Sequence, residues 1–496
     1  MRKGSIALLL LIASVFYAGC NGERKFKSRR SEEGYRLATA HCKSCHQFPE
    51  ADLLDKQTWA TYVLPKMSGF LGFRYMQGGS YFENGSRPEA MPLADWKKIV
   101  SYYVQESQDA TNNQQQRPAI EMILKHFSPV MPAFRLHSPA TTFIKIVPAQ
   151  QVLLADGSSQ NIYSVTTAGA VRDSVKVAEG VVHIQMDAGG LQVLSMGLLH
   201  PSDEKAGKLT TADFTQKQTQ LVLDSLQRPV YIEYADLNKD GLTDIVLCEF
   251  GNTLGQLSWY ENTGNKQYKK HVLRPLPGAT RTQLLDVNRD GNMDIIALMA
   301  QGDEGFFIYY NWGNGSFTEQ RVLRFSPSHG SNYFELADFN GDGYQDILAT
   351  NGDNGDYPPI LKSYHGVRVY LNDGKNNFRE KVFLSMNGAS KAMARDFDKD
   401  GDLDIAAVSY FPDYDHRPQE SFVYWENNGG FSFKPYSFPQ AAAGRWLTMD
   451  AGDIDGDGDE DIVLGNAKFT LGTIPEAIMQ SWNENAPSFI ILKNTK

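Results

Sequence analysis

Five copies of one short acidic pattern constrain the fold of this chain more than any other feature. Each copy reads Asp-x-(Asn/Asp)-x-Asp-Gly-x-x-Asp followed by isoleucine, and the copies begin 50 to 58 residues apart. Alternate oxygen-bearing side chains on a tight loop converge on one hard cation, and the glycine permits the sharp turn. We therefore predict five calcium loops, with these ligands: Asp236, Asn238, Asp240, Asp244, Asp286, Asn288, Asp290, Asp294, Asp338, Asn340, Asp342, Asp346, Asp396, Asp398, Asp400, Asp404, Asp453, Asp455, Asp457 and Asp461.

The sequence after each loop excludes an EF-hand. An EF-hand has a glutamate at the twelfth loop position and a helix on each side. Here the twelfth position is Leu247 in the first loop and Ala297 in the second, within apolar runs that favour strands. Aromatic-Asn-Gly hairpin signals follow, for example in 259–264 and 424–429. Each repeat is therefore expected to form about four strands.

This repeat resembles the FG-GAP/VCBS repeat of integrin-type β-propellers, in which the calcium loop joins the innermost strand of a blade to the second strand. The resemblance covers about residues 130–496 and implies an all-β, seven-bladed β-propeller. Two blades without metal loops are expected before the first clear repeat, with inner strands at 151–157 and 182–190. An early segment such as 134–136 is expected to complete the last blade and close the ring.

A second motif lies near the N-terminus, where Cys42-Lys43-Ser44-Cys45-His46 has the pattern of c-type haem attachment. On one helical turn both thiols can form thioethers to the porphyrin while the imidazole reaches the iron. Met91 is the predicted sixth ligand, with Met67 and Met76 as alternatives. A zinc site is disfavoured, because it would need a second Cys/His pair and residues 30–110 offer none.

Around this motif the chain resembles a small class I cytochrome c over about residues 31–108. The resemblance implies a small all-α domain with covalent haem c, held through Cys42, Cys45, His46 and Met91. In that family the first and last helices cross at a glycine that faces an aromatic residue. The corresponding residues here are Gly34 and either Tyr102 or Tyr103, the latter two in an amphipathic closing segment.

The first 20 residues resemble a bacterial lipoprotein signal peptide. A charged start is followed by an apolar run that is too short to span a bilayer and by a box that ends at Cys20. The resemblance implies a lipid on Cys20 and a tether at 21–30, which would anchor the protein in the bacterial envelope, facing the periplasm or the cell exterior. The alternative is ordinary cleavage and release. Cys248 lies in an apolar run and is expected to be a small buried thiol.

The predicted organisation is a multi-domain chain. It consists of a signal peptide (1–20), a tether (21–30), the cytochrome c domain (31–108), a linker (109–129) and the propeller (130–496). The formal net charge of −10 reflects the acidic loops, which bound calcium would neutralise, and it argues against a nucleic-acid partner.

A ligand would bind on the propeller face opposite the calcium loops. Arg281, His329, Lys391 and Arg445 are expected near strand entrances on that face. Three insertions add aromatic and charged side chains, namely Tyr357, Tyr364, His365, Tyr414, Asp415, His416, Arg417 and Trp482. Such groups would suit a carbohydrate, an anion or a quinone, or they are ordinary loop residues.

These features favour an electron carrier with a redox partner protein over a catalyst. In the first alternative, a quinoprotein-like dehydrogenase oxidises a carbohydrate or alcohol on the propeller. In the second, the propeller is a carbohydrate-binding module or a lyase. No catalytic residue is predicted.

Overall fold

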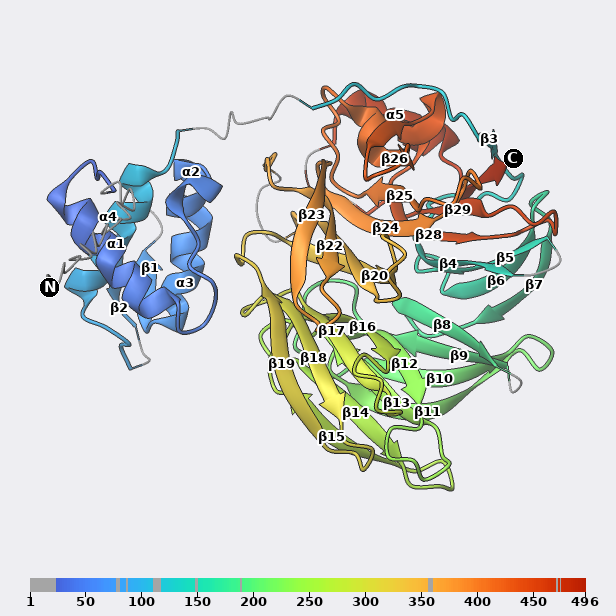
Figure 1. The fold of residues 1–496 in the computed structure, drawn as a ribbon, viewed down its shortest axis with the longest axis horizontal. Helices are drawn as coiled ribbons and strands as arrows, with labels where there is room; N and C mark the ends of the chain where they lie inside the picture. The colour runs from blue at the N-terminus through green and yellow to red at the C-terminus, as the bar shows by residue number, and fades with distance from the viewer. Residues whose placement is uncertain are drawn as a thin grey trace, which may run out of the picture.

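The computed structural model describes residues 24–76, 81–85, 88–109, 117–147, 150–187, 190–355, 360–469, 472 and 474–496. The predicted signal peptide with Cys20, the start of the tether and residues 110–116 of the linker lie outside the described residues. A mainly helical N-terminal region precedes seven four-stranded sheets arranged as a ring (Figure 1). Among the described residues, no helix is both long and apolar enough to cross a membrane.

The N-terminal region contains two long helices, α1 (Arg29–Cys42) and α4 (Leu93–Glu106). Helix α1 begins after Ser28, whose side chain accepts a hydrogen bond from the N–H of Ser31 and caps the helix. Between the long helices lie η1 (Ala51–Leu53), α2 (Lys56–Thr58), η2 (Trp59–Val63), α3 (Leu64–Phe70) and the hairpin of β1 (Phe73–Met76) and β2 (Tyr81–Asn84).

Helices α1 and α4 approach each other at Gly34. A Cβ atom on Gly34 would lie 2.0 Å from the backbone oxygen of Lys98 and 2.9 Å from Cβ of Tyr102. Only glycine permits this approach without a shift of the backbone. The predicted crossing of the first and last helices at a glycine that faces an aromatic residue is confirmed, with Tyr102 as the partner.

The seven sheets form a seven-bladed propeller, as predicted. Their innermost strands β4, β8, β12, β16, β20, β24 and β28 contact one another in a closed ring. The first two blades are β4 (Thr141–Val147) to β7 (Val171–Lys176), through β5 (Gln151–Asp156) and β6 (Asn161–Thr166), and β8 (Val181–Asp187) to β11 (Gln218–Leu226), through β9 (Gly190–Ser195) and β10 (Gly207–Asp213).

Five further blades carry the acidic loops. Three of them are β12 (Pro229–Ala235), β13 (Asp244–Glu249), β14 (Gln256–Asn262) and β15 (Tyr268–Arg274); β16 (Ala279–Leu285), β17 (Asp294–Met299), β18 (Gly305–Asn311) and β19 (Phe317–Arg324); and β20 (Ser331–Ala337), β21 (Asp346–Asn351), β22 (Gly366–Asn372) and β23 (Phe378–Ser385). The other two are β24 (Ala389–Arg395), β25 (Asp404–Ser409), β26 (Phe422–Asn427) and β27 (Phe433–Tyr436); and β28 (Trp446–Gly452), β29 (Asp461–Asn466), β30 (Phe489–Asn494) and β3 (Phe127–Val130).

The second strand of each loop-bearing blade is buried along its whole length, as in β13 and β17. These strands are packed on both faces by neighbouring blades, which explains why they are continuous apolar runs rather than alternating ones. Three short helices decorate the ring: η3 (Pro418–Ser421), η4 (Pro439–Ala443) and α5 (Glu476–Asn485).

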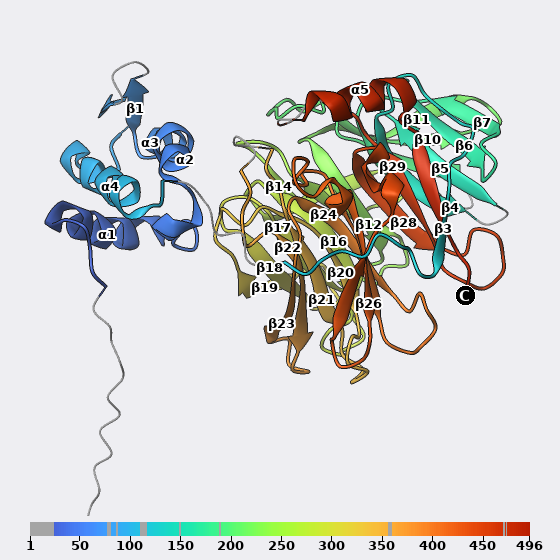
Figure 2. The same cartoon turned by 90° about the horizontal axis from the view of Figure 1, so that it is seen from above.

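The ring is closed by β3, which pairs antiparallel with the C-terminal strand β30. Figure 2 shows the chain running from the N-terminal helices across the propeller to β3, beside the C-terminus. Closure by an early segment is confirmed, but the predicted segment 134–136 is wrong. Phe134 lies in a loop and packs on Tyr163 (5.2 Å between ring centroids). Because β3 begins at Phe127, the predicted boundary at 129/130 cuts the closing strand.

The first loop-free blade also differs from prediction. Residues 151–157 were expected to form an inner strand, but they form the second strand, β5, and β4 is innermost. Both strands are apolar and half-buried or buried, so composition does not separate them. In the second loop-free blade, the expected inner strand at 182–190 corresponds to β8.

Candidate functional site

The five acidic loops have equivalent places, where each joins the innermost strand of a blade to the second. The Asp236 carboxylate accepts hydrogen bonds from the backbone N–H groups of Asp240 (3.2 Å) and Gly241 (2.9 Å). The side chain of Asp240 accepts one from the N–H of Leu242 (2.8 Å). The glycine N–H bonds to the first aspartate in the other loops too, at Asp286, Asp338, Asp396 and Asp453.

The last aspartate of each loop is fully buried. Asp244 accepts hydrogen bonds from the backbone N–H groups of Leu237 (3.0 Å) and Asn262 (2.8 Å), so it braces the loop against the blade. Burial, with the neighbouring loop acids, raises the pKa of all five of these carboxyls, to about 7 for Asp404 and about 6 for Asp461. A bound cation would favour their charged forms.

Carboxylate oxygens gather most closely in the last two loops. They lie within 4.8 Å of one another in two sets, Asp396, Asp398 and Asp400, and Asp453, Asp455 and Asp461. The first three loops have asparagine at the third position, and Asn238 donates its amide to Asp240 (3.0 Å). Calcium takes six to eight oxygen ligands in flexible geometry, so the side chains of the loops fit this ion.

The Cys42-Lys43-Ser44-Cys45-His46 motif lies at the C-terminal end of α1. The N–H groups of Cys45 and His46 point to the carbonyl of Cys42 (3.4 and 3.3 Å), so the motif forms one tight turn. His46 Nδ1 lies 2.9 Å from the carbonyl oxygen of Gln47 and donates to it, which leaves Nε2 as the free acceptor. Burial lowers the pKa of His46 and raises the pKa of the Cys42 thiol to about 11.

The candidate methionine ligands differ in their surroundings. Met91 is 5% exposed and belongs to the core of the N-terminal region, against which Cys42 and Met67 also pack. Met76 lies at the end of β1 and is half-buried. Two free thiols, a neutral imidazole and a buried thioether around one core form a donor set that fits a c-type haem.

The N-terminal region touches the propeller through the insertion that follows β21. The hydroxyl of Tyr364 donates to the carbonyl of Leu53 (3.2 Å), and Ile360 packs against the helical core. The charges of Arg324 and Asp303, in the blade β16–β19, also act on the pKa of His46, although burial dominates. The haem-type motif therefore lies near the propeller face opposite the calcium loops.

Two of the predicted ligand-face cations meet at the propeller axis. The guanidinium of Arg281 lies 4.3 Å from the ring centroids of both Tyr231 and Tyr333, and Lys391 Nζ lies 5.0 Å from that of Tyr333. Burial lowers the pKa of Lys391 to about 8, although Asp450 partly opposes the shift. The tyrosines were missed because each contributes from a different blade. The signal was their shared place, the third residue of β12 and of β20.

Other predicted ligand-face residues have structural roles. Arg445 is 1% exposed and donates to the carbonyls of Tyr410 (2.9 Å) and Phe469 (2.7 Å). Trp482 donates its indole N–H to Ala442 (2.8 Å) and packs with Tyr414.

The remaining residues of the predicted face are dispersed. His329 packs on Tyr364 (5.2 Å between centroids), and His365 is fully buried. His416 lies 3.1 Å from Asp413, and Arg417 pairs with Glu420 (3.0 Å). Asp415 is exposed, and Tyr357 lies outside the described residues. The predicted face is thus mostly structural around its rim and polar at its axis.

A family model for the FG-GAP-like repeat matches residues 236–297, 286–349 and 396–464, which together include all five acidic loops. The propeller carries FG-GAP-like repeats. The comparison with curated proteins finds no match.

Three solved structures share the fold at low identity. *S. cerevisiae* Dbp5 bound to Nup159, Gle1, IP6 and ADP matches at 10% identity and a TM-score of 0.42, over 76% of this chain and 97% of that chain. The Dos1 propeller matches at 8% and 0.41, over 72% and 78%. Streptogramin B lyase matches at 11% and 0.46, over 75% and 98%. The propeller assignment rests on this chain's own strand pairing.

Proposed function

We propose that the protein is an envelope-anchored c-type cytochrome that transfers electrons through a covalent haem, with its propeller as a calcium-binding docking or ligand-binding module. The observation that carries the proposal is the arrangement of Cys42, Cys45 and His46. Two thiols and a neutral imidazole share one helical turn and stand against a core that contains Met91. The partner would be a redox protein or an oxidoreductase.

Each residue of the motif would have a distinct task. Cys42 and Cys45 would hold the haem through thioether bonds, and His46 and Met91 would be the axial ligands. The bound haem supplies one-electron redox chemistry. The hydrogen bond from His46 to the carbonyl of Gln47 orients the ring and keeps Nε2 available. The buried aromatic side chains of the domain, such as Trp96, would keep water from the site.

Covalent attachment is tested with the Cys42→Ala/Cys45→Ala double variant. The wild-type polypeptide should keep a haem stain after denaturing electrophoresis, and the double variant should lose it. Cys248→Ala removes a buried thiol far along the chain and is the matched control, which should keep the stain. Extraction of the wild-type chromophore into acidified organic solvent would refute covalent attachment.

The sixth ligand is tested by comparing Met91→Ala with Met67→Ala. A His/Met pair gives a low-spin ferric haem with a weak methionine charge-transfer band at the red end of the visible spectrum. Met91→Ala should abolish that band, and Met67→Ala should retain it. The reverse pattern would assign Met67 as the ligand.

Anchoring depends on Cys20 in this proposal. Two or more acyl chains on that residue would hold both domains at a membrane, since each buried methylene contributes about 0.8 kcal/mol. Cys20→Ser should move the protein from the membrane fraction to the soluble fraction. If the variant stays with the membrane like wild type, the lipid anchor is wrong.

A second candidate function is an oxidoreductase that binds its substrate at the propeller axis. It is favoured by Arg281 and Lys391 around Tyr333, and by the contact of Tyr364 with the N-terminal region. Haem reduction by added sugars or alcohols, with and without a quinone, would support this candidate. Cleavage of a sugar polymer without haem reduction would favour the carbohydrate lyase instead.

A further inference from the structure

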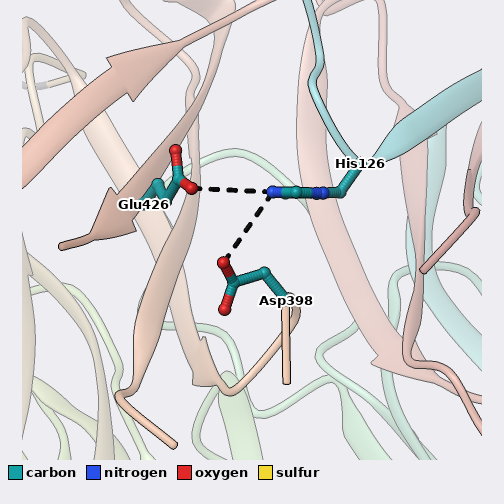
Figure 3. Close-up of side chains that lie close together, drawn as sticks. All are labelled: His126, Asp398 and Glu426. Carbon is teal, nitrogen blue, oxygen red and sulfur yellow. Dashed lines mark ion pairs between the residues drawn. The ribbon is translucent and has the colours of Figure 1, made fainter. Parts of the chain in front are cut away.

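His126, Asp398 and Glu426 come together from three separate parts of the chain. His126 directly precedes the closing strand β3, Asp398 is the third residue of the fourth acidic loop, and Glu426 lies in β26. His126 Nε2 is 3.8 Å from Oδ2 of Asp398 and 3.6 Å from Oε1 of Glu426. Figure 3 shows the imidazole nitrogen pointing between the two carboxylates.

The three side chains are buried and incompletely satisfied. His126, Asp398 and Glu426 are 7%, 6% and 4% exposed. His126 Nε2 and Oε2 of Glu426 have no hydrogen-bond partner, although buried polar atoms are nearly always paired. Lys125 Nζ donates to Oε1 of Glu426 (2.6 Å) and balances one carboxylate. A cation among the three would satisfy the imidazole nitrogen and balance the second carboxylate.

The last blade solves the same charge problem in another way. There the third loop position is Asp455, and its carboxylate forms an ion pair with Lys493 in β30. Lys493 directly precedes Asn494, as Glu426 directly precedes Asn427, so the two residues occupy equivalent places in their blades. Where the last blade has a lysine, the neighbouring blade has a second carboxylate and receives a histidine from the closing segment.

We propose that His126, Asp398 and Glu426 bind one divalent transition-metal ion of the Zn²⁺ class, which fastens the closing strand β3 to the neighbouring blade. Zinc–ligand bonds of about 2.0–2.2 Å in a tetrahedron separate the ligand atoms by about 3.3–3.6 Å. The observed 3.6 and 3.8 Å require shifts of only a few tenths of an ångström. An imidazole ligand selects this class over calcium and magnesium.

The site can coexist with calcium in the fourth loop. Oδ1 of Asp398 faces the loop, where it accepts a hydrogen bond from the N–H of Asp400 (3.2 Å), while Oδ2 faces His126. One carboxylate would therefore bridge a loop ion and the proposed ion. Water would complete the tetrahedron.

The test is calorimetric titration of the full chain with Zn²⁺ at saturating Ca²⁺, in a Cys42→Ala/Cys45→Ala background that removes competing thiols. The background protein should bind one Zn²⁺ that raises its melting temperature. His126→Asn and Glu426→Gln should each weaken this binding more than about 100-fold, since loss even of a residue that only supports a ligand costs 10–100-fold. Two variants guard against a folding defect in one.

His271→Asn is the matched control. His271 Nε2 also contacts a glutamate, Glu261 (2.8 Å), in the equivalent part of another blade, but the two form a simple pair. Zinc affinity should be unchanged in this variant. X-ray absorption at the zinc edge should show nitrogen and oxygen ligands with imidazole scattering. The proposal is overturned if zinc does not bind, if calcium displaces it, or if His126→Asn binds as tightly as the background protein.

Discussion

The blades with acidic loops and the two blades without them make the same four-stranded sheet in different ways. In the blade β12–β15, residues 236–243 separate the two inner strands, whereas residues 148–150 and 188–189 do so in the loop-free blades. A short hairpin needs only turn residues to pair its strands. The long loop instead folds on its own side chains, as Asp236 does through the N–H groups of Asp240 and Gly241.

A buried aspartate is nevertheless present in both kinds of blade. Asp294 accepts hydrogen bonds from the N–H groups of Val287 (3.0 Å) and Asn311 (2.8 Å). In the loop-free blade β4–β7, Asp156 accepts them from Ala140 and Ser159, both at 2.7 Å. Bracing a strand end therefore requires a buried carboxylate but no metal. The additional acids of the long loops are largely exposed, and those are the residues that a cation would explain.

Chelation should separate the two kinds of blade most strongly. Each filled loop would stabilise the folded state by about 2.7 kcal/mol when free calcium is at 100 times its dissociation constant. Exhaustive chelation should therefore lower the melting temperature, and hydrogen exchange should accelerate first in β12–β30 rather than in β4–β11. An unchanged melting temperature would mean that turn hydrogen bonds alone hold the loops.

The two buried aspartates offer a matched pair of intermediate effect. Asp294→Ala and Asp156→Ala each leave two backbone N–H groups without an acceptor, at about 1–3 kcal/mol per group. The cost of Asp294→Ala should be larger in calcium than in chelator, because the variant also loses a metal ligand. Denaturant unfolding in both buffers measures this difference. The cost of Asp156→Ala should be equal in the two buffers, and a calcium-dependent cost there would break the distinction.

The parts of the fold that the sequence predicted are those encoded locally. The five loops, their strands and the contact of Gly34 with α4 follow from patterns within a few turns of chain. Strand β3 does not, since it contains Pro129 and is a strand only because the backbone of β30, far away in sequence, pairs with it. Composition likewise could not rank β4 and β5 within their blade.

Site residues divide along the same line. The Cys42–His46 motif is contiguous and was found directly, and Met91 followed from the resemblance. His126, in contrast, gains its meaning from Asp398 and Glu426, which are hundreds of residues away. The axial group of Arg281, Tyr333 and Lys391 has the same character, with one residue from each of three strands. Pairing register, rather than local pattern, decides such sites.

The smallest expected effect is a pH dependence that originates at Glu304, at the other end of a loop-bearing blade. Glu304 is 1% exposed and accepts hydrogen bonds from the N–H (2.9 Å) and hydroxyl (2.6 Å) of Ser331. Burial raises its pKa from 4.5 to about 8. Between these values the folded state keeps a proton that the unfolded state releases. The free energy of unfolding therefore falls as pH rises, by at most about 1.4 kcal/mol per pH unit, until the folded carboxyl ionises.

Glu304→Gln should remove this slope, because the amide stays neutral and still offers a carbonyl oxygen to Ser331. Denaturant unfolding of both proteins from pH 5.5 to 7.5 measures the difference, below the range in which Lys391 titrates. Saturating calcium should keep Asp404 and Asp461 ionised, whereas in chelator their raised pKa values add a slope of the same sign. Parallel slopes for wild type and Glu304→Gln in calcium would show that Glu304 ionises normally. A slope that is the same with and without calcium would remove the acidic loops from the titration.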